Sequence, residues 1–321
     1  MPLAPNTDNY LYGQGVVMFK RNGDTGFLHL GNVPDFGITV TVTKEDHYSS
    51  MTPTREKDLT RVTEKSATST IVLEEVSPEN INLAFMGDGV ATEAQEAGSI
   101  DGVTVDVVPN RFVELDKVGL YITRVQHLSV NAGPFSNGET VTGGTAASGK
   151  VAWAGTGYLE LIDVSGSFAP GETLTGSTSS AETVISSATR QPDAVVLGSG
   201  ATPSRYVQGK DYTIQTDGGL IRALSTGDIT GTCVVYAQYN DKSLHNINAL
   251  VNSTVEGELL FIGTTQDGPK KRVRGWKTML TITGETKYIG TAISTLPLQA
   301  EYLSDTLNHP ANPFFIETTI E

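Results

Sequence analysis

The chain is short of cysteine and of positive charge, and each shortage excludes a class of protein. Cys233 is the single cysteine among 321 residues, so no disulfide forms within the chain and no cysteine-rich metal site is available. Lysine and arginine number 22 against 36 aspartates and glutamates, which gives a net charge of -14. Because nucleic-acid phosphates are bound by clustered cations, this composition argues against a protein that coats DNA. The lone cysteine suits a reducing cytosol.

Long apolar runs are also missing. The longest, such as Leu259-Leu260-Phe261-Ile262, fall well below the roughly 18 residues that a membrane-spanning helix requires. Residues 1–8 have neither a basic start nor an apolar stretch, so we expect no signal peptide. In contrast, the chain is rich in threonine and contains 34 glycines, a composition that favours strands and tight turns. We therefore expect a mainly β, folded protein without a membrane segment.

Alternating apolar residues and turn signals predict the strands. Every second residue from Phe36 to Val42 is apolar, which places these side chains on one face of a strand. Asn22-Gly23 and Asp217-Gly218 each stand between apolar runs and predict hairpin turns. The sequence therefore predicts β-hairpins near both the start and the middle of the chain.

A single helix and one long loop are predicted between the strands. Ser77 has the character of an N-cap, Pro78 suits the first helical position and Gly87 marks the end. Residues 46–60 are polar, carry both signs of charge and predict a long loop. Loops of that length in compact domains are usually functional or disordered, which makes this segment a candidate contact region.

The middle of the chain contains an internal repeat. The pattern Phe-x-x-Gly-Glu-Thr-x-Thr-Gly occurs at Phe135–Gly143 and again at Phe168–Gly176, and the match extends to Val151 and Val184. Two copies are too few for a solenoid, so we expect a small β domain over residues 131–190. This domain is predicted to be inserted into a larger one that is formed by residues 1–130 and 191–321.

None of the motifs in the chain supports catalysis or a cofactor. Gly144–Lys150 satisfies the phosphate-loop pattern, but Val151 replaces the magnesium-binding hydroxyl and no helical pattern follows. The chain has no nucleophile elbow, no spacing supports a hydrolase with a carboxylate pair, and the histidines are dispersed. These are His29, His47, His127, His245 and His309. We therefore expect no enzyme activity, no cofactor and no metal.

A basic segment interrupts the acidic chain. Residues 270–277 hold five of the 22 basic residues around Trp276. The segment has the pattern of a nuclear signal or a phosphate contact, but in so acidic a chain we favour the start of a strand whose cations meet acidic residues of a neighbouring subunit. The candidate contact residues are Lys270, Lys271, Arg272 and Arg274.

The order of these features resembles the major tail tube proteins of long-tailed, non-contractile bacteriophages, those of Chi-like phages included. The resemblance is carried by the N-terminal hairpin with Gly31–Val40, by Glu45–Ser50 with Arg55–Thr60, by the helix at Ser77–Asp88 and by the hairpin at Val207–Ile221. It covers most of the chain outside 131–190. The motifs are structural rather than catalytic, so the resemblance depends on their shared order.

The resemblance implies a fold and an assembly. The fold is a β-sandwich or barrel with one flanking helix, and subunits close into hexameric rings that stack as the tube through which phage DNA is ejected. The polar segment then supplies the contact between rings, with candidate residues His47, Tyr48, Arg55, Glu56, Lys57 and Asp58. The 131–190 domain is expected on the tube exterior, and residues 1–14 and 308–315 are expected to order on neighbouring subunits.

The resemblance also implies partners and a location. The partners are further copies of the chain, the tape measure protein, the tail terminator and the tail-tip proteins, and DNA passes through the lumen without specific binding. The protein is then a virion component that is assembled in the host cytoplasm. The alternative that we keep open is a glycan-binding surface adhesin, for which Trp153 or Trp276 has to be exposed among polar neighbours.

Overall fold

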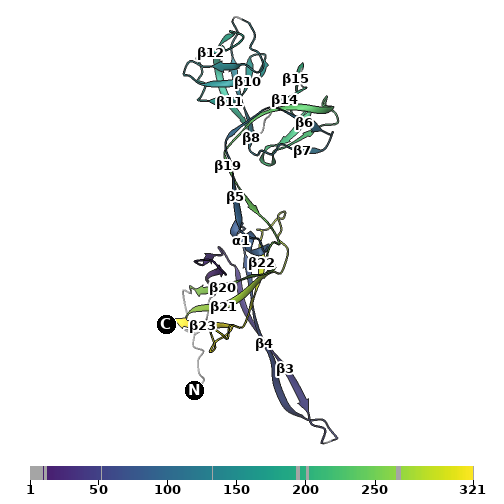
Figure 1. Ribbon diagram of the computed structural model, residues 1–321, viewed down its shortest axis with the longest axis vertical. Coiled ribbons are helices and arrows are strands. Elements are labelled where there is room, and N and C mark those ends of the chain that lie inside the picture. Colours follow the sequence, from purple (N-terminus) through teal and green to yellow (C-terminus); the bar gives the residue numbers. More distant parts are fainter. Residues whose placement is uncertain are drawn as a thin grey trace. The chain divides into compact units, whose positions relative to one another are not determined.

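The computed structural model describes residues 10, 13–51, 53–131, 133–192, 196–199, 202–264 and 269–320. It is mainly β with one short α-helix, which confirms the predicted fold class. The chain divides into two compact units, a first unit of Met1–Thr92 with His245–Glu321 and a second unit of Glu93–Leu244 (Figure 1). These boundaries differ from the predicted ones at 131 and 190, because the repeat segment shares a sheet with the strands that flank it in sequence.

The first unit contains one eight-stranded antiparallel sheet. Its order is β2-β1-β20-β21-β22-β4-β3, and β23 also pairs with β21. The strands are β1 (Gly15–Arg21), β2 (Leu28–His29), β3 (Asp35–Tyr48), β4 (Lys57–Leu73), β20 (Val255–Gly263), β21 (Lys270–Ile282), β22 (Leu296–Tyr302) and β23 (Phe315–Ile320). The hairpin predicted at Asn22-Gly23 is confirmed, since β1 and β2 pair with Phe19 opposite Leu28.

The one α-helix of the described residues, α1 (Pro78–Ala84), begins as predicted. Ser77 is its N-cap, and the Ser77 hydroxyl oxygen accepts a 3.2 Å hydrogen bond from the Asn80 backbone N–H. The helix ends at Ala84 with Phe85 as its C-cap, before the predicted stop at Gly87. It packs on β21 and β22 and adds Leu83 to the hydrophobic core of the first unit.

The second unit is built on a ten-stranded sheet. Its order is β11-β10-β9-β12-β13-β8-β18-β14-β15, and β6 pairs with β18. The strands are β6 (Gly98–Val107), β8 (Leu120–His127), β9 (Thr140–Thr142), β10 (Ser148–Gly155), β11 (Tyr158–Ser165), β12 (Thr173–Gly176), β13 (Glu182–Pro192), β14 (Val196–Ser199), β15 (Thr202–Tyr206) and β18 (Gly231–Tyr239).

Two smaller sheets complete the described chain. The order β16-β17-β7 joins Tyr212–Gln215, Leu220–Ala223 and Phe112–Glu114. The hairpin predicted at Asp217-Gly218 is confirmed, and Gly219 closes its turn with φ 62. Strands β5 (Val90–Gln95) and β19 (Lys242–Ile247) pair with each other, and each contains a boundary between the two units. None of the helices in the described ranges is long and apolar enough to cross a membrane.

The two copies of the repeat have the same local structure. The repeat strands β9 and β12 pair with each other, with Thr142 opposite Thr175. Residues at matching positions are buried together, as four pairs show: Phe135 and Phe168, Val141 and Leu174, Ala147 and Ala181, Val151 and Ile185. The sequence match of Val151 with Val184 is therefore wrong by one residue. The turn of the second copy, closed by Gly176 N–H donating to Ala181 O, is one residue longer than the turn closed by Gly143 and Ala147.

The two copies differ in what their glutamates do. Glu139 is buried, and its carboxylate accepts hydrogen bonds from the backbone N–H groups of Thr178 and Ser179 at 3.1 and 3.0 Å, from the Ser179 hydroxyl and from Ser136 N–H. Glu172, its counterpart, is half-buried and accepts from Ala169 N–H at 3.3 Å. Burial raises the pKa of Glu139, but these hydrogen bonds lower it by more, so the net shift is downward.

Candidate assembly surface

The hairpin of β3 and β4 extends beyond the core of the first unit as an arm, which we define as residues 40–65 (Figure 1). The two strands stay paired from Val42 opposite Lys65 to Tyr48 opposite Lys57. Almost every described side chain in the arm is exposed, whereas Ile71 at its base is fully buried. The arm is therefore a regular two-stranded structure with no core of its own.

An apolar stripe follows one face of the arm. Phe36 and Ile38 pack against the core of the first unit, and the same face continues outward through Val40 and Val42. The exposed fractions of Val40 and Val42 are 61% and 42%, and Val62, opposite Lys44, is also exposed. The prediction that these residues share a face is confirmed. The face is covered only at its base, because within the described chain the hydrophobic cluster ends at Ile38 on β3 and at Ala67, opposite Val40, on β4.

The predicted contact residues lie together at the end of the arm, but not in a long loop. Asp46 pairs with Thr60, His47 with Leu59 and Tyr48 with Lys57, so the loop prediction for 46–60 is wrong at residues 46–48 and 57–60, and the segment between the strands is 49–56. The reason is that the pairing is made by backbone groups, which a polar sequence does not prevent. All six predicted residues, His47, Tyr48, Arg55, Glu56, Lys57 and Asp58, are exposed.

Two pairs of charged or polar side chains meet at the end of the arm. His47 Nδ1 lies 2.6 Å from Asp58 Oδ1, and Lys57 Nζ lies 2.8 Å from Asp46 Oδ1. Hydrogen bonds from Lys57 and from the Thr60 hydroxyl lower the pKa of Asp46. These two pairs lie at the end of the arm, whereas the apolar stripe lies nearer its base and has no covering element among the described residues.

The sequence contains a signal for the exposure of this face. Alternation at Phe36–Val42 indicates which side chains share a face, but it does not indicate what covers them. A covered face of two paired strands usually shows apolar alternation on both, and residues 57–66 offer almost none. The apolar residues that do lie on the partner strand there, Leu59 and Val62, are exposed and are not among the predicted contact residues.

The basic segment forms the first part of β21, as predicted, but its cations meet their own chain. Lys271 Nζ lies 2.8 Å from Glu317 on β23. Arg274 donates two hydrogen bonds to Glu258 on β20, from Nε at 3.1 Å and from an Nη at 2.5 Å. We expected acidic residues of a neighbouring subunit instead. The difference arises because β21 has a strand on each side, and both neighbouring strands present glutamates to it.

Two cations of this segment, Lys270 and Arg272, stay candidates for a contact with a neighbouring subunit. Lys270 and Arg272 are exposed at the start of β21, and of the four predicted contact residues only these have no ion-pair partner among the described residues. Burial raises the pKa of Glu258, while hydrogen bonds from Arg274 and Lys20 lower it by more. Arg274 is therefore paired with a charged carboxylate of its own chain.

Neither tryptophan offers an open platform. The Trp276 indole stacks on His309 with ring centroids 3.8 Å apart, and the Arg274 guanidinium lies 4.9 Å from its centroid. Its Nε1–H donates a 3.0 Å hydrogen bond to Asn312 O. The segment 308–315 thus packs on its own chain, contrary to our expectation of a neighbouring subunit. Of residues 1–14, which were also expected to order on a neighbouring subunit, residues 1–9, 11 and 12 lie outside the described residues. The second tryptophan, Trp153, packs beside Ile122 and Ile162.

Side chains that could catalyse a reaction or bind a ligand do not come together in the described chain. Residues 144–150 form a turn followed by the start of β10, with Gly149 paired to Val141, and no helix follows that could cradle a phosphate. Burial raises the pKa of the Cys233 thiol to about 11. Within the described ranges, no three histidine, cysteine or acidic side chains come together in a way that could hold a metal ion.

Comparison with known proteins places the chain in a family without assigning a function. The chain matches the family described as "Protein of unknown function UCP028589" over residues 10–145 and 161–314. No curated protein matches it. The two matched ranges cover most of both units and include the arm and the basic segment. The chain therefore belongs to the protein family of unknown function UCP028589.

Proposed function

We propose that the protein is a structural subunit that assembles with copies of itself into the tail tube of a long-tailed bacteriophage. In this proposal, subunits form hexameric rings that stack into the conduit for DNA ejection, and the protein has no catalytic role. The tape measure, tail terminator and tail-tip proteins are its partners in the virion. Support comes from the resemblance in motif order and from the surface of the first unit.

The arm is the observation that carries the proposal. A two-stranded hairpin is marginally stable by itself in water, yet this one stays paired as far as Tyr48 opposite Lys57. Its apolar stripe continues the core without a break, and contiguous exposed apolar surface on a soluble protein usually marks an interaction site. A neighbouring subunit that covers Val40, Val42 and Val62 supplies the core that the arm lacks.

Open sheet edges support the same proposal. Among the described residues of the first unit, β3 pairs only with β4 and β23 pairs only with β21. Edge strands attract further strands, and closed rings of subunits are one way in which proteins remove them. Pairing of such edges between subunits extends the sheet around a ring.

The acidic charge fits a conduit. Each subunit carries a net charge of -14, and a ring multiplies it. A lumen with a negative potential repels DNA phosphates, so the genome slides through without adhering. The alternative of a glycan-binding adhesin loses its main support, because Trp276 is covered by His309 and Arg274 and Trp153 packs beside apolar residues.

Electron microscopy and sedimentation of purified protein test the proposal. The wild-type chain is expected to form rings or tubes of uniform bore. Val40→Asp, on the apolar face, is expected to leave a folded monomer, because a carboxylate cannot be buried in the contact without a large cost. Thr41→Asp is the matched control, since it places the same charge one residue away on the opposite face.

A shortened arm provides a second test. Replacing residues 44–63 with Asn-Gly joins Thr43 to Glu64, which are paired in the structure, through a two-residue hairpin turn. This variant is expected to fold but not to stack. A wild-type protein that stays monomeric at high concentration contradicts the proposal. Assembly of the shortened variant into normal tubes would show that the arm is not the contact between rings.

A further inference from the structure

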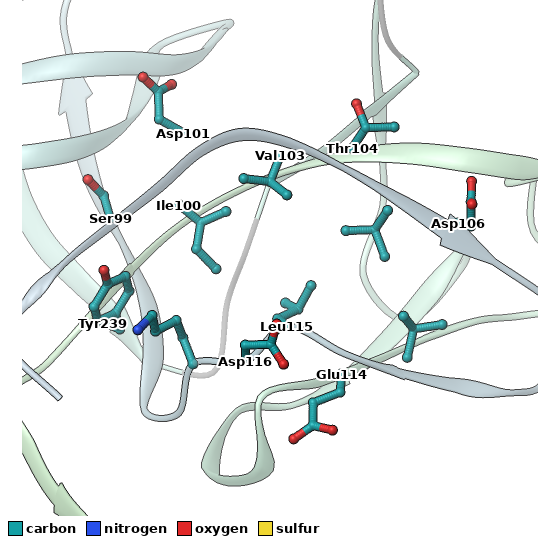
Figure 2. A pocket seen from close by; sticks show the side chains of 13 residues that line it. Ser99, Ile100, Asp101, Val103, Thr104, Asp106, Glu114, Leu115, Asp116 and Tyr239 are labelled. Atoms are coloured by element: carbon teal, nitrogen blue, oxygen red, sulfur yellow. The ribbon is translucent and has the colours of Figure 1, made fainter. Parts of the chain in front are cut away.

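The second unit contains a groove between two edge strands. Among the described residues, β6 pairs only with β18 and β7 pairs only with β17. The two open edges diverge from the turn that joins them and enclose a groove of about 620 Å³, whose second wall continues through Leu115 to Lys117 (Figure 2). The backbone groups along this side of β6 are therefore available to a further strand.

The two faces of β6 differ in chemistry. Figure 2 shows Ile100 and Val103 on the side of β6 that faces Leu115, and Asp101, Thr104 and Asp106 on the opposite side. The alternation passes through a bulge, since the register with β18 shifts at this point. A strand added to β6 thus meets apolar groups on one face and carboxylates on the other.

The apolar side of the groove is already built. Val105, Val113 and Leu115 are half-buried and pack against the same hydrophobic cluster as the buried Ile100. Val103 has no such cover, and its exposed fraction is 51%. An incoming apolar side chain therefore finds a preformed surface and covers Val103 at little cost in ordering.

The charge around the groove is negative. Glu114 and Asp116 project from the wall formed by β7 and the residues after it, and Asp106 lies on the face of β6 that points away from Leu115 (Figure 2). Of the cations nearby, Lys150 is paired with Asp101, and Lys117 lies over the Tyr239 ring at 5.4 Å from its centroid. No ion-pair partner in the described chain neutralises Glu114, Asp116 or Asp106.

We propose that this groove binds an extended basic segment of a partner polypeptide, which adds to the open edge of β6 as a further strand. Alternate residues of the segment are apolar and face Leu115, and the residues between them are lysine or arginine and face Asp106. Backbone hydrogen bonds supply affinity, and the alternating side chains supply selectivity. The proposal does not depend on the tail tube function, because it concerns the second unit and a different partner.

A second copy of the chain is a poor occupant of the groove. Antiparallel pairing of β6 with another β6, in the register that sets Asp101 of one copy opposite Asp106 of the other, brings carboxylates together, and like charges in directly opposed positions destabilise a sheet. The net charge of -14 on each copy adds to the repulsion. The charge complement of the groove is therefore a basic polypeptide.

Fluorescence anisotropy with synthetic peptides on the full-length protein tests the proposal. The probe is a labelled peptide of sequence Lys-Val-Lys-Val-Thr-Val-Arg. One twin carries glutamate in place of each basic residue, and a second twin carries backbone N-methyl groups that remove the hydrogen-bond donors. Saturable binding is expected for the basic peptide. Binding of each twin is expected to be at least about tenfold weaker, because it lacks either the charge pairs or the strand pairing.

Variants locate the site. Asp106→Lys is expected to weaken binding about three- to tenfold, and Val103→Lys by a similar factor, since each introduces a cation where the peptide lies. Asp217→Lys and Val184→Lys are matched controls in the same unit outside the groove, and both are expected to leave affinity within about twofold. Circular dichroism checks that all four variants fold.

Each contrary result overturns a defined part of the proposal. Equal binding of the N-methylated twin excludes strand addition. Equal binding of the acidic twin, or of the Asp106→Lys variant, excludes recognition by charge. Absence of saturable binding by the basic peptide overturns the proposal as a whole, and assembly of the protein into tubes is unaffected by any of these outcomes.

Discussion

The arm and the repeat segment are both built from threonine-rich antiparallel strands, yet one has a core and the other has none. In the repeat, Val141 and Leu174 are fully buried. In the arm, Val40 is 61% exposed although it follows the same alternation. The repeat places two hairpins so that each covers the other, whereas the arm is one hairpin that extends past its sheet. Alternation in a strand therefore specifies a face, and a second element decides whether that face is buried.

The largest expected difference between the two regions is in the cost of truncating an apolar side chain. Leu174→Ala removes a fully buried side chain and is expected to lower the free energy of unfolding of the second unit by about 2–5 kcal/mol. Urea denaturation followed by circular dichroism measures the change. A cost below about 1 kcal/mol would mean that the repeat core is loosely packed and that the contrast with the arm does not hold.

The two repeat glutamates give the next largest difference. Glu139→Gln removes the charge that accepts hydrogen bonds from Thr178, Ser179 and Ser136, and we expect a loss of about 1–3 kcal/mol. Glu172→Gln is the matched control and is expected to cost less than about 1 kcal/mol, because Glu172 is half-buried and accepts from Ala169 alone among the bonds described. Equal costs in thermal unfolding would show that the two copies are equivalent after all.

The same pair of variants predicts a dependence on pH. The pKa of Glu139 is lowered from its ordinary value of 4.5, so its contribution to stability is fully present above that pH and declines as the pH falls through the lowered value. The stability difference between wild type and Glu139→Gln is therefore expected to shrink on acidification below pH 4.5. Denaturation midpoints measured across this range check the prediction, and a difference that grows at low pH has the wrong sign.

The smallest expected effect is on the fold of the isolated subunit when the arm is changed. Val40→Asp is expected to alter the free energy of unfolding by less than about 0.5 kcal/mol, because Val40 is exposed in the single chain. The measurement is made on dissociated protein at low concentration. A large loss of stability there would indicate that Val40 is covered within its own chain, and the comparison between arm and repeat would fail.

Local signals determined which parts of the fold were predictable. The turn at Asn22-Gly23 and the cap at Ser77 each depend on a few adjacent residues, and both hairpin and helix start are confirmed. The repeat was visible because its glycines and apolar residues recur in order. The sequence did not show that Val151 corresponds to Ile185 and not to Val184, because the residues on either side of a turn do not fix its length.

The candidate surface depended on contacts that are distant in sequence. Arg274 meets Glu258 on the neighbouring strand, and Lys271 meets Glu317 near the end of the chain, so their partners follow from strand order rather than from local composition. The exposure of Val40 likewise follows from the lack of a covering element. The sequence thus indicated which residues gather at the end of the arm, but not that four of them, His47, Tyr48, Lys57 and Asp58, lie on paired strands.

The hydrogen bonds of Glu139 link the two copies of the repeat, and this link has a consequence for how the segment evolves. The carboxylate of the first copy closes the turn of the second at Thr178 and Ser179. Loss of the first copy removes the acceptor of that turn, and loss of the second removes the donors at Thr178 and Ser179 and leaves the Glu139 carboxylate with Ser136 N–H. Once duplicated, the two hairpins are therefore expected to be inherited or lost as a pair, although each carries the complete sequence pattern on its own.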